Sequence, residues 1–149
     1  MAHAMPVHRR PDFSGEWTLN AQRSKLGLEQ LRGLESAIVR VDHRDPHFQL
    51  WRKFVLRGEA HIVDLGLDAR GQAIESRVGK QRRVSCLTWE EDTLVFTTHM
   101  YASGGVSTNI VRYTLEQDGE VLQARESFRG PALSYENFWV FERVSGPTE

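Results

Sequence analysis

The residues best suited to chemistry are histidines on predicted strands. His99 precedes Met100 and Tyr101 and lies shortly before the glycine pair at 104–105. An imidazole there is suited to general acid/base catalysis, to haem ligation or to a polar contact with a bound molecule. His61 lies on another predicted strand and is the second candidate haem ligand. For His99, the competing interpretation is a hydrogen-bonded residue at the rim of the domain.

Strong catalytic signatures are missing from the sequence. It has no Gly-x-Ser-x-Gly, no glycine-rich phosphate loop, no His-Glu-x-x-His and no dinucleotide-binding fingerprint. His43 and His47 flank Asp45 in a predicted turn, where a metal site with Asp42 competes with ordinary surface histidines. The only cysteine, Cys86, allows neither an intrachain disulfide nor a zinc–thiolate cluster. We therefore predict no metal, no cofactor and no defined catalytic residue.

Arg112 and Arg125 are the candidate contacts for an anion, because a guanidinium presents a planar fork of donors to a carboxylate. They lie on two predicted strands joined by an Asp-Gly turn at 118–119, which is a strong hairpin signal. One phase places both arginines inward, with Thr108, Ile110, Thr114, Gln123 and Ser127, and leaves Glu126 outside.

The opposite phase sends both arginines to solvent. Its inward set is apolar and consists of Val111, Tyr113, Leu115, Leu122, Ala124 and Phe128. Both phases stay open, and the site prediction uses the one with inward arginines. On the final strand, the set that shares a face with Phe141 is Tyr135, Asn137 and Trp139.

These residues need strands to position them, and the chain supplies strands almost throughout. In the opening stretch 12–20, polar residues alternate with Phe13, Gly15, Trp17 and Leu19. Trp17 is expected to plug one end of a barrel or to be a general core residue. Asn20 as an N-cap and Gly27 as a stop predict a short helical segment within 21–34.

From residue 36 onward the pattern has a period of two. Along 47–57, one face carries Phe48, Leu50, Arg52, Phe54 and Leu56, and the other carries Trp51 and Val55. About ten short strands joined by tight turns predict an all-β, antiparallel up-and-down meander that closes into a barrel. We expect one domain at 12–145, a flexible N-terminal tail at 1–11 and a C-terminal tail at 146–149.

Composition narrows the class of partner. The formal net charge is -1, so nothing favours nucleic acid or an anionic membrane surface. No apolar run approaches the ~20 residues that span a bilayer, so we predict no membrane insertion. The first residues lack the apolar core of a signal peptide, which predicts a cytoplasmic protein, with a removed signal as the alternative. The oligomeric state is open, with a homodimer as one alternative.

The order of elements resembles the calycins, and in length and layout it is most similar to the fatty-acid-binding-protein branch. The residues that carry this resemblance are Phe-Ser-Gly-Glu-Trp-Thr-Leu at 13–19 and Phe-Trp-Val-Phe-Glu-Arg at 138–143. The stretch 13–27 also resembles small lipocalin-like proteins of uncharacterised function found in bacteria. The resemblance implies a barrel that holds one small ligand inside.

The resemblance also implies where a ligand would be held. In fatty-acid-binding proteins the ligand carboxylate meets arginines and a tyrosine on the last strands. Here Trp139 and Phe141 stand at the paired positions of the last strand, so that part of the clamp is not reproduced. Arg112 and Arg125 are the remaining candidates for an anionic head group.

We therefore predict reversible, non-covalent binding of a small, largely apolar ligand, with an anionic head group as a variant, and no required reaction. The predicted ligand-binding residues are Trp51, His99, Tyr101, Arg112, Arg125, Tyr135, Asn137 and Trp139. One alternative is an enzyme on the same barrel (an isomerase, cyclase or hydratase) that uses His99 with Tyr101 or an arginine. Others are haem binding through a strand histidine and a structural module with a filled barrel.

Overall fold

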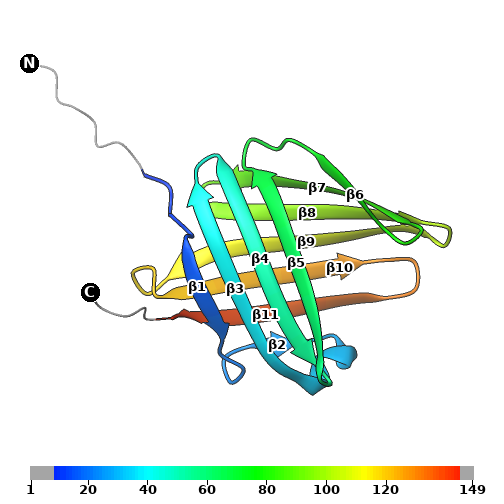
Figure 1. Cartoon of the computed structure of the whole chain (residues 1–149), viewed down its shortest axis with the longest axis horizontal. Coiled ribbons are helices and arrows are strands. Elements are labelled where there is room, and N and C mark those ends of the chain that lie inside the picture. The colour runs from blue at the N-terminus through cyan, green and yellow to red at the C-terminus, as the bar shows by residue number, and fades with distance from the viewer. Residues whose placement is uncertain (1–8, 145–149) are drawn as a thin grey trace, which may run out of the picture.

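Alternating residues and tight turns build eleven antiparallel strands in the computed structural model, which describes residues 9–144 (Figure 1). The elements are β1 (Gly15–Leu19), β2 (Lys25–Leu26), the 3-10 helix η1 (Glu29–Gly33), β3 (Leu34–Arg44), β4 (His47–Leu56), β5 (Glu59–Asp68), β6 (Ile74–Val78), β7 (Gln81–Glu90), β8 (Thr93–Ala102), β9 (Gly105–Glu116), β10 (Val121–Arg129) and β11 (Ser134–Arg143). Apart from residues 9–11, the two predicted tails lie outside the described residues.

The strands form a nearly closed barrel. They are hydrogen-bonded in the order β5-β4-β3-β1-β11-β10-β9-β8-β7-β6, and β2 pairs with β11 outside this path. In Figure 1, β1, β3, β4 and β5 cross over β7 to β11. Strands β5 and β6 are the two ends of the path, and an isolated bridge between Arg70 and Thr88 lies close by. The predicted all-β, up-and-down barrel is confirmed, with a gap between β5 and β6.

The segment after β1 contains less helix than the sequence predicts. Asn20 accepts a hydrogen bond from the backbone N–H of Arg23 (3.1 Å), but this closes a turn and caps no helix. Strand β2 pairs with β11 instead, and the Gly27 N–H donates to the Glu136 carbonyl (3.1 Å). Pairing with β11 satisfies backbone groups that a helix would satisfy internally. Within residues 9–144, no helix has the length and hydropathy needed to cross a membrane.

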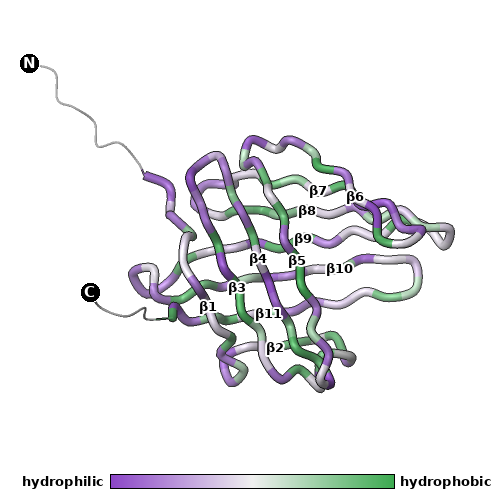
Figure 2. Tube along the Cα trace, in the orientation of Figure 1, coloured by the Kyte–Doolittle hydropathy of each residue, from purple (hydrophilic) through white to green (hydrophobic). Residues whose placement is uncertain are grey.

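One end of the barrel is filled by side chains. Hydrophilic and hydrophobic residues are mixed along the strands, as two-faced strands require (Figure 2). Trp17 is 0% exposed, and its indole Nε1 donates to the Phe13 carbonyl at 3.2 Å. The largest other side chains buried to this degree are Phe13, Leu50, Leu87, Leu94 and Leu122. The complete burial of Trp17 agrees with both predicted roles, a plug of one barrel end and a general core residue.

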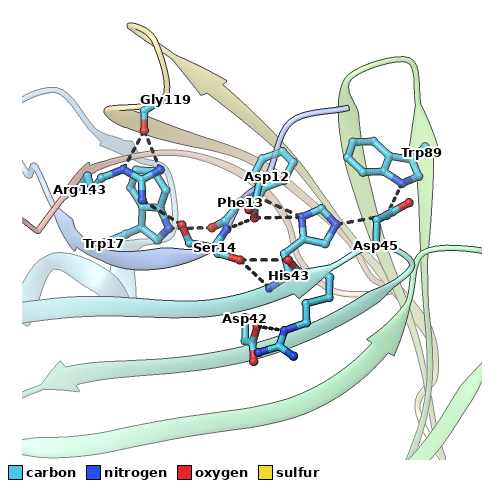
Figure 3. Close-up of polar contacts among 11 residues, drawn as sticks. Asp12, Phe13, Ser14, Trp17, Asp42, His43, Asp45, Trp89, Gly119 and Arg143 are labelled. Atoms are coloured by element: carbon cyan, nitrogen blue, oxygen red, sulfur yellow. Dashed lines mark hydrogen bonds and ion pairs between the residues drawn. The ribbon is translucent and has the colours of Figure 1, made fainter. Parts of the chain in front are cut away.

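Arg143 fixes this plug by joining three distant parts of the chain (Figure 3). Its guanidinium lies over the Trp17 ring, 4.2 Å from the ring centroid. It donates to the Ser14 carbonyl at 2.9 Å, and to the Gly119 carbonyl at 3.1 and 2.9 Å. Gly15 has φ +143°, and a Cβ at this position would collide with the guanidinium. Arg143 therefore holds β1, β11 and the β9–β10 turn together.

Arg143→Ala is expected to lower the free energy of unfolding by about 3 kcal/mol, because it removes a partly buried cation–π contact and charged hydrogen bonds. Urea denaturation measures the change. Arg40→Ala is the matched control, since Arg40 stacks over Trp51 at 4.5 Å on the exposed outer face. The control should cost about 1 kcal/mol or less. Equal losses in the two variants would contradict the bridging role of Arg143.

Candidate functional site

The half of the barrel away from the plug contains a cavity of about 440 Å³. It is bounded by β4 to β11, and Ile62 and Val78 beside the β5–β6 gap are 58% and 55% exposed. The lining residues are Arg52, Ile62, Val63, Asp64, Leu65, Ser76, Val78, Arg83, Ser85, Phe96, Thr98, Met100, Asn109, Glu126, Phe128 and Tyr135. The lining combines apolar side chains with a similar number of polar and charged ones. Small-molecule sites also combine apolar surface with polar groups that orient the ligand.

Glu126 is the centre of the polar groups in this cavity. Its Oε1 accepts hydrogen bonds from Asn137 Nδ2 (2.8 Å) and Trp139 Nε1 (3.0 Å), and its Oε2 accepts one from Asn109 Nδ2 (3.0 Å). All three donors are neutral, and they come from β9 and β11 on either side of β10. Cross-strand neighbours thus stabilise a carboxylate inside the barrel, where an unbonded charge would be costly.

Arg52 reaches the same cavity from β4. Its guanidinium lies 5.1 Å from the Phe54 ring centroid, and its Nε–H is buried without a hydrogen-bond partner. Among the described residues, Arg52 forms no ion pair. Burial raises the pKa of the Tyr113 hydroxyl, the charge of Arg52 opposes this shift and the charge of Glu126 adds to it. Tyr113 therefore lies within the fields of both charges.

Aromatic rings form a floor below the charged groups. Phe54 stacks on Trp139 with centroids 5.0 Å apart, and Trp139 stacks on Phe141 at 6.1 Å. Only about 10 Å³ remains open in this layer, which Arg52 and Glu126 also line. The two charges therefore lie where the open cavity meets the packed end of the barrel.

Three of the predicted site residues lie in or beside this cluster, and all three are on β11. Tyr135 lines the cavity and stacks on Phe128 with centroids 4.9 Å apart, and burial raises its pKa. Asn137 and Trp139 donate to Glu126. The predicted inward face of the last strand is therefore confirmed.

Arg112 and Arg125 point away from the cavity, so the predicted inward phase of these strands is wrong. The register itself follows the Asp-Gly turn, because Arg112 lies opposite Arg125. The face is reversed, since both arginines are exposed and Val111 and Tyr113 are buried. Arg125 stacks over Phe138 at 4.6 Å on the outside. The apolar alternative set is buried because the barrel interior selects the more hydrophobic face.

Three other predicted contacts also lie on the outer face. Trp51 stacks beneath Arg40, and Tyr101 lies beneath the Arg82 guanidinium at 4.9 Å. His99 Nδ1 is hydrogen-bonded to Thr108 Oγ1 at 3.0 Å, across the β8–β9 pair. Their neighbours on the strands face inward, and none of the three lines the cavity. Their prediction as interior ligand contacts is therefore wrong.

The sequence predicts His43 in a turn, but it lies near the end of β3, where its buried side chain joins a group of hydrogen bonds (Figure 3). The His43 side chain is 2% exposed, and its Nδ1 accepts a hydrogen bond from the Phe13 N–H at 3.2 Å. Its Nε2 lies 3.2 Å from Asp45 Oδ1, which also accepts from Trp89 Nε1 at 2.9 Å. Within residues 9–144, no cluster of three potential metal ligands is found. His43 therefore anchors the segment that precedes β1.

Sequence reasoning missed Arg52, Asn109, Tyr113 and Glu126 as site residues. A signal existed for Arg52, which alternates in phase with Phe48 and Leu50 on an otherwise apolar face. A charged residue on such a face marks a polar group inside the barrel. Glu126 was expected on the outer face, and the three donors that hold it inside come from strands whose pairing and facing must both be known.

Stability at high pH should depend on Tyr113. Because burial raises its pKa in the folded state, the folded protein retains this proton above pH 10, whereas the unfolded chain releases it. The free energy of unfolding is unaffected below pH 10 and should fall above it, by up to about 1.4 kcal/mol per pH unit. Denaturation midpoints measured against pH should fall less in Tyr113→Phe. The exposed Tyr101→Phe should behave like the wild type, and an unchanged decline in Tyr113→Phe would contradict this assignment.

Comparison with known proteins supports the fold and adds no sequence relative. No protein-family model matches the chain, and neither does any curated protein sequence. A secretory abundant heat soluble protein from Ramazzottius varieornatus is similar in structure, with 9% identity, a TM-score of 0.63, and coverage of 88% of this chain and 94% of the other. Zebrafish ileal bile acid-binding protein, in complex with cholic acid, gives 9% identity, a TM-score of 0.58, and coverage of 89% and 98%. A structure described as a fatty acid transporter is 10% identical, with a TM-score of 0.53, and the match covers 89% of this chain and 98% of the other. The chain thus shares the β-barrel fold of these proteins, which agrees with the barrel that the sequence predicts.

Proposed function

We propose that this protein reversibly binds a small, largely apolar molecule with an acidic end inside the barrel. The apolar body would lie against Phe96, Met100 and Phe128, and the acidic end would meet Arg52 near the aromatic floor. Removing the apolar body from water would supply most of the affinity, and Arg52 would orient the ligand. No bond is made or broken.

The observation that carries this proposal is the buried Nε–H of Arg52, which has no hydrogen-bond partner in the described chain. Such a donor costs about 1–3 kcal/mol while it is unsatisfied. A ligand carboxylate that reaches this N–H from the cavity would remove this cost and neutralise a cation that forms no ion pair among the described residues. Arg52 thus takes the orienting role that the sequence assigned to Arg112 and Arg125.

The charges around the cavity also favour an anion. Arg52 and Arg83 are cationic, and Arg83 donates to Gln81 at 2.7 Å. Glu126 is the inward anion, while the Asp64 side chain accepts from Gln49 on the exposed outer surface (2.7 Å). The inward side chains therefore carry a net positive charge, which raises the local concentration of an anionic ligand.

A second hollow, of about 460 Å³, is a poorer candidate. It is lined by residues of β3, β4 and β5, together with Gln72 and with Ile74 at the start of β6, and lies at the other end of β4. Its charged side chains already have partners, since Arg44 pairs with Asp42 (3.6 Å) and Asp68 pairs with Arg70 (2.6 Å). The residues that line the interior cavity include two with polar atoms that lack hydrogen-bond partners in the described chain, so a ligand can add hydrogen bonds there.

Two structures with this fold add support of a general kind. The zebrafish protein is described as bile acid-binding, and another neighbour as a fatty acid transporter. Two alternatives, catalysis and haem ligation, depended on His99 inside the barrel. His99 faces outward and is hydrogen-bonded to Thr108, so it does not support either of them. His61 lies opposite Phe54 but is exposed and does not line the cavity.

Binding of dodecanoate and dodecanol, measured by isothermal titration calorimetry, tests the proposal. Arg52→Met keeps an apolar side chain and removes the guanidinium, so dodecanoate should bind about tenfold or more weakly. Dodecanol should lose less affinity, because it lacks the negative charge. Arg112→Met is the matched control and should leave both affinities unchanged. No binding of either compound to the wild type, or a loss confined to Arg112→Met, would refute the proposal.

A further inference from the structure

Asn109 lines the cavity, and its side-chain carbonyl oxygen is buried without a hydrogen-bond partner among the described residues. Its Nδ2 donates to Glu126 Oε2 at 3.0 Å, and because a carboxylate only accepts, this bond fixes which way the amide points. The Oδ1 is buried and has no hydrogen-bond partner among the described residues. A buried acceptor beside a cavity needs a donor, which a bound molecule or a water can supply.

Asn137 shows how both the donor and the acceptor of an asparagine side chain can be hydrogen-bonded in the same cluster. It also donates to Glu126, at 2.8 Å, but its Oδ1 accepts from the backbone N–H groups of Gly27 (2.8 Å) and Leu28 (3.2 Å). The two asparagines flank one carboxylate from opposite sides, on β11 and β9. One of them fastens the segment after β2 to the barrel, and the other is left free to meet a ligand.

Two residues that line one cavity therefore each carry a buried group without a hydrogen-bond partner in the described chain, one a donor and one an acceptor. Arg52 Nε–H lacks an acceptor, and Asn109 Oδ1 lacks a donor. Glu126 connects the two groups, since it bonds to Asn109 and acts with Arg52 on Tyr113. A plain alkanoate would satisfy Arg52 and leave Asn109 unpaired. A site with a buried polar group discriminates against an analogue that lacks the matching group.

We propose that the preferred ligand is an amphipathic acid with a hydrogen-bond donor close to its carboxylate, such as an N-acyl amino acid or a hydroxy acid. Arg52 binds the carboxylate and Asn109 selects for the donor. This inference rests on the proposed function and narrows its ligand class. It makes Asn109 the residue that determines specificity within the cavity.

Three ligands titrated calorimetrically into the wild-type protein test this inference. N-dodecanoylglycine has an amide N–H, its ester analogue dodecanoyloxyacetate replaces only that N–H with oxygen, and dodecanoate lacks the unit. We expect the amide to bind about tenfold more tightly than the ester. Equal affinities would overturn the inference and leave the proposed function standing. If none of the three binds, the proposed function itself fails.

Asn109→Leu assigns the preference to its residue, because leucine keeps the approximate shape and removes the acceptor. The ratio between amide and ester affinities should fall to about one in this variant, whatever its absolute affinity for the three ligands. Thr108→Val is the control on the outer face of β9, and it should keep the wild-type ratio. A preference that persists in Asn109→Leu would assign the selection to another group and overturn the role of Asn109. The ligand series on the wild type remains decisive if this variant fails to fold.

Discussion

Closure of the barrel depends on the contact between Arg143 and Trp17. The first and last long strands must pair, and Trp17 lies directly opposite Arg143 in that pairing. The guanidinium then lies over the indole and bonds to the carbonyls of Ser14 and Gly119. This geometry leaves no room for a Cβ at Gly15. A single side chain thus holds together segments near both ends of the described chain and the turn between β9 and β10.

Because the barrel end around Trp17 is packed with side chains, the hydrogen-bonded cluster around Glu126 lies in the other half of the barrel. Glu126 is held by neutral donors from two neighbouring strands, and one of these donors, Asn137, also binds the backbone after β2. The cluster is therefore part of the framework, and its positions do not depend on a mobile loop. Arg52 enters from β4 on the opposite wall, so the two charges approach the cavity from different faces of the barrel.

Local patterns predicted the architecture well, whereas the site required non-local knowledge. The alternation around Trp17, the run of hairpins and the inward face of β11 could all be read from the sequence. The β9–β10 register was also correct, yet its two faces were exchanged when the arginines were placed inside. Hydrophobicity favoured the other face, and that face is the buried one.

The helix expected after Asn20 is replaced by pairing with β11, a contact between residues more than a hundred positions apart. Glu126 could not be recognised as interior without its partners on β9 and β11.

The proposed binding site depends on Arg52, whose buried Nε–H has no hydrogen-bond partner among the described residues. The most direct measurement is the NMR resonance of the Arg52 Nε–H during addition of dodecanoate, observed together with those of Arg112 and Arg125. We expect the Arg52 resonance to move until binding saturates, because its donor gains an acceptor, while the two outer arginines keep their positions. Movement of Arg112 or Arg125 with an unchanged Arg52 would contradict the interior site.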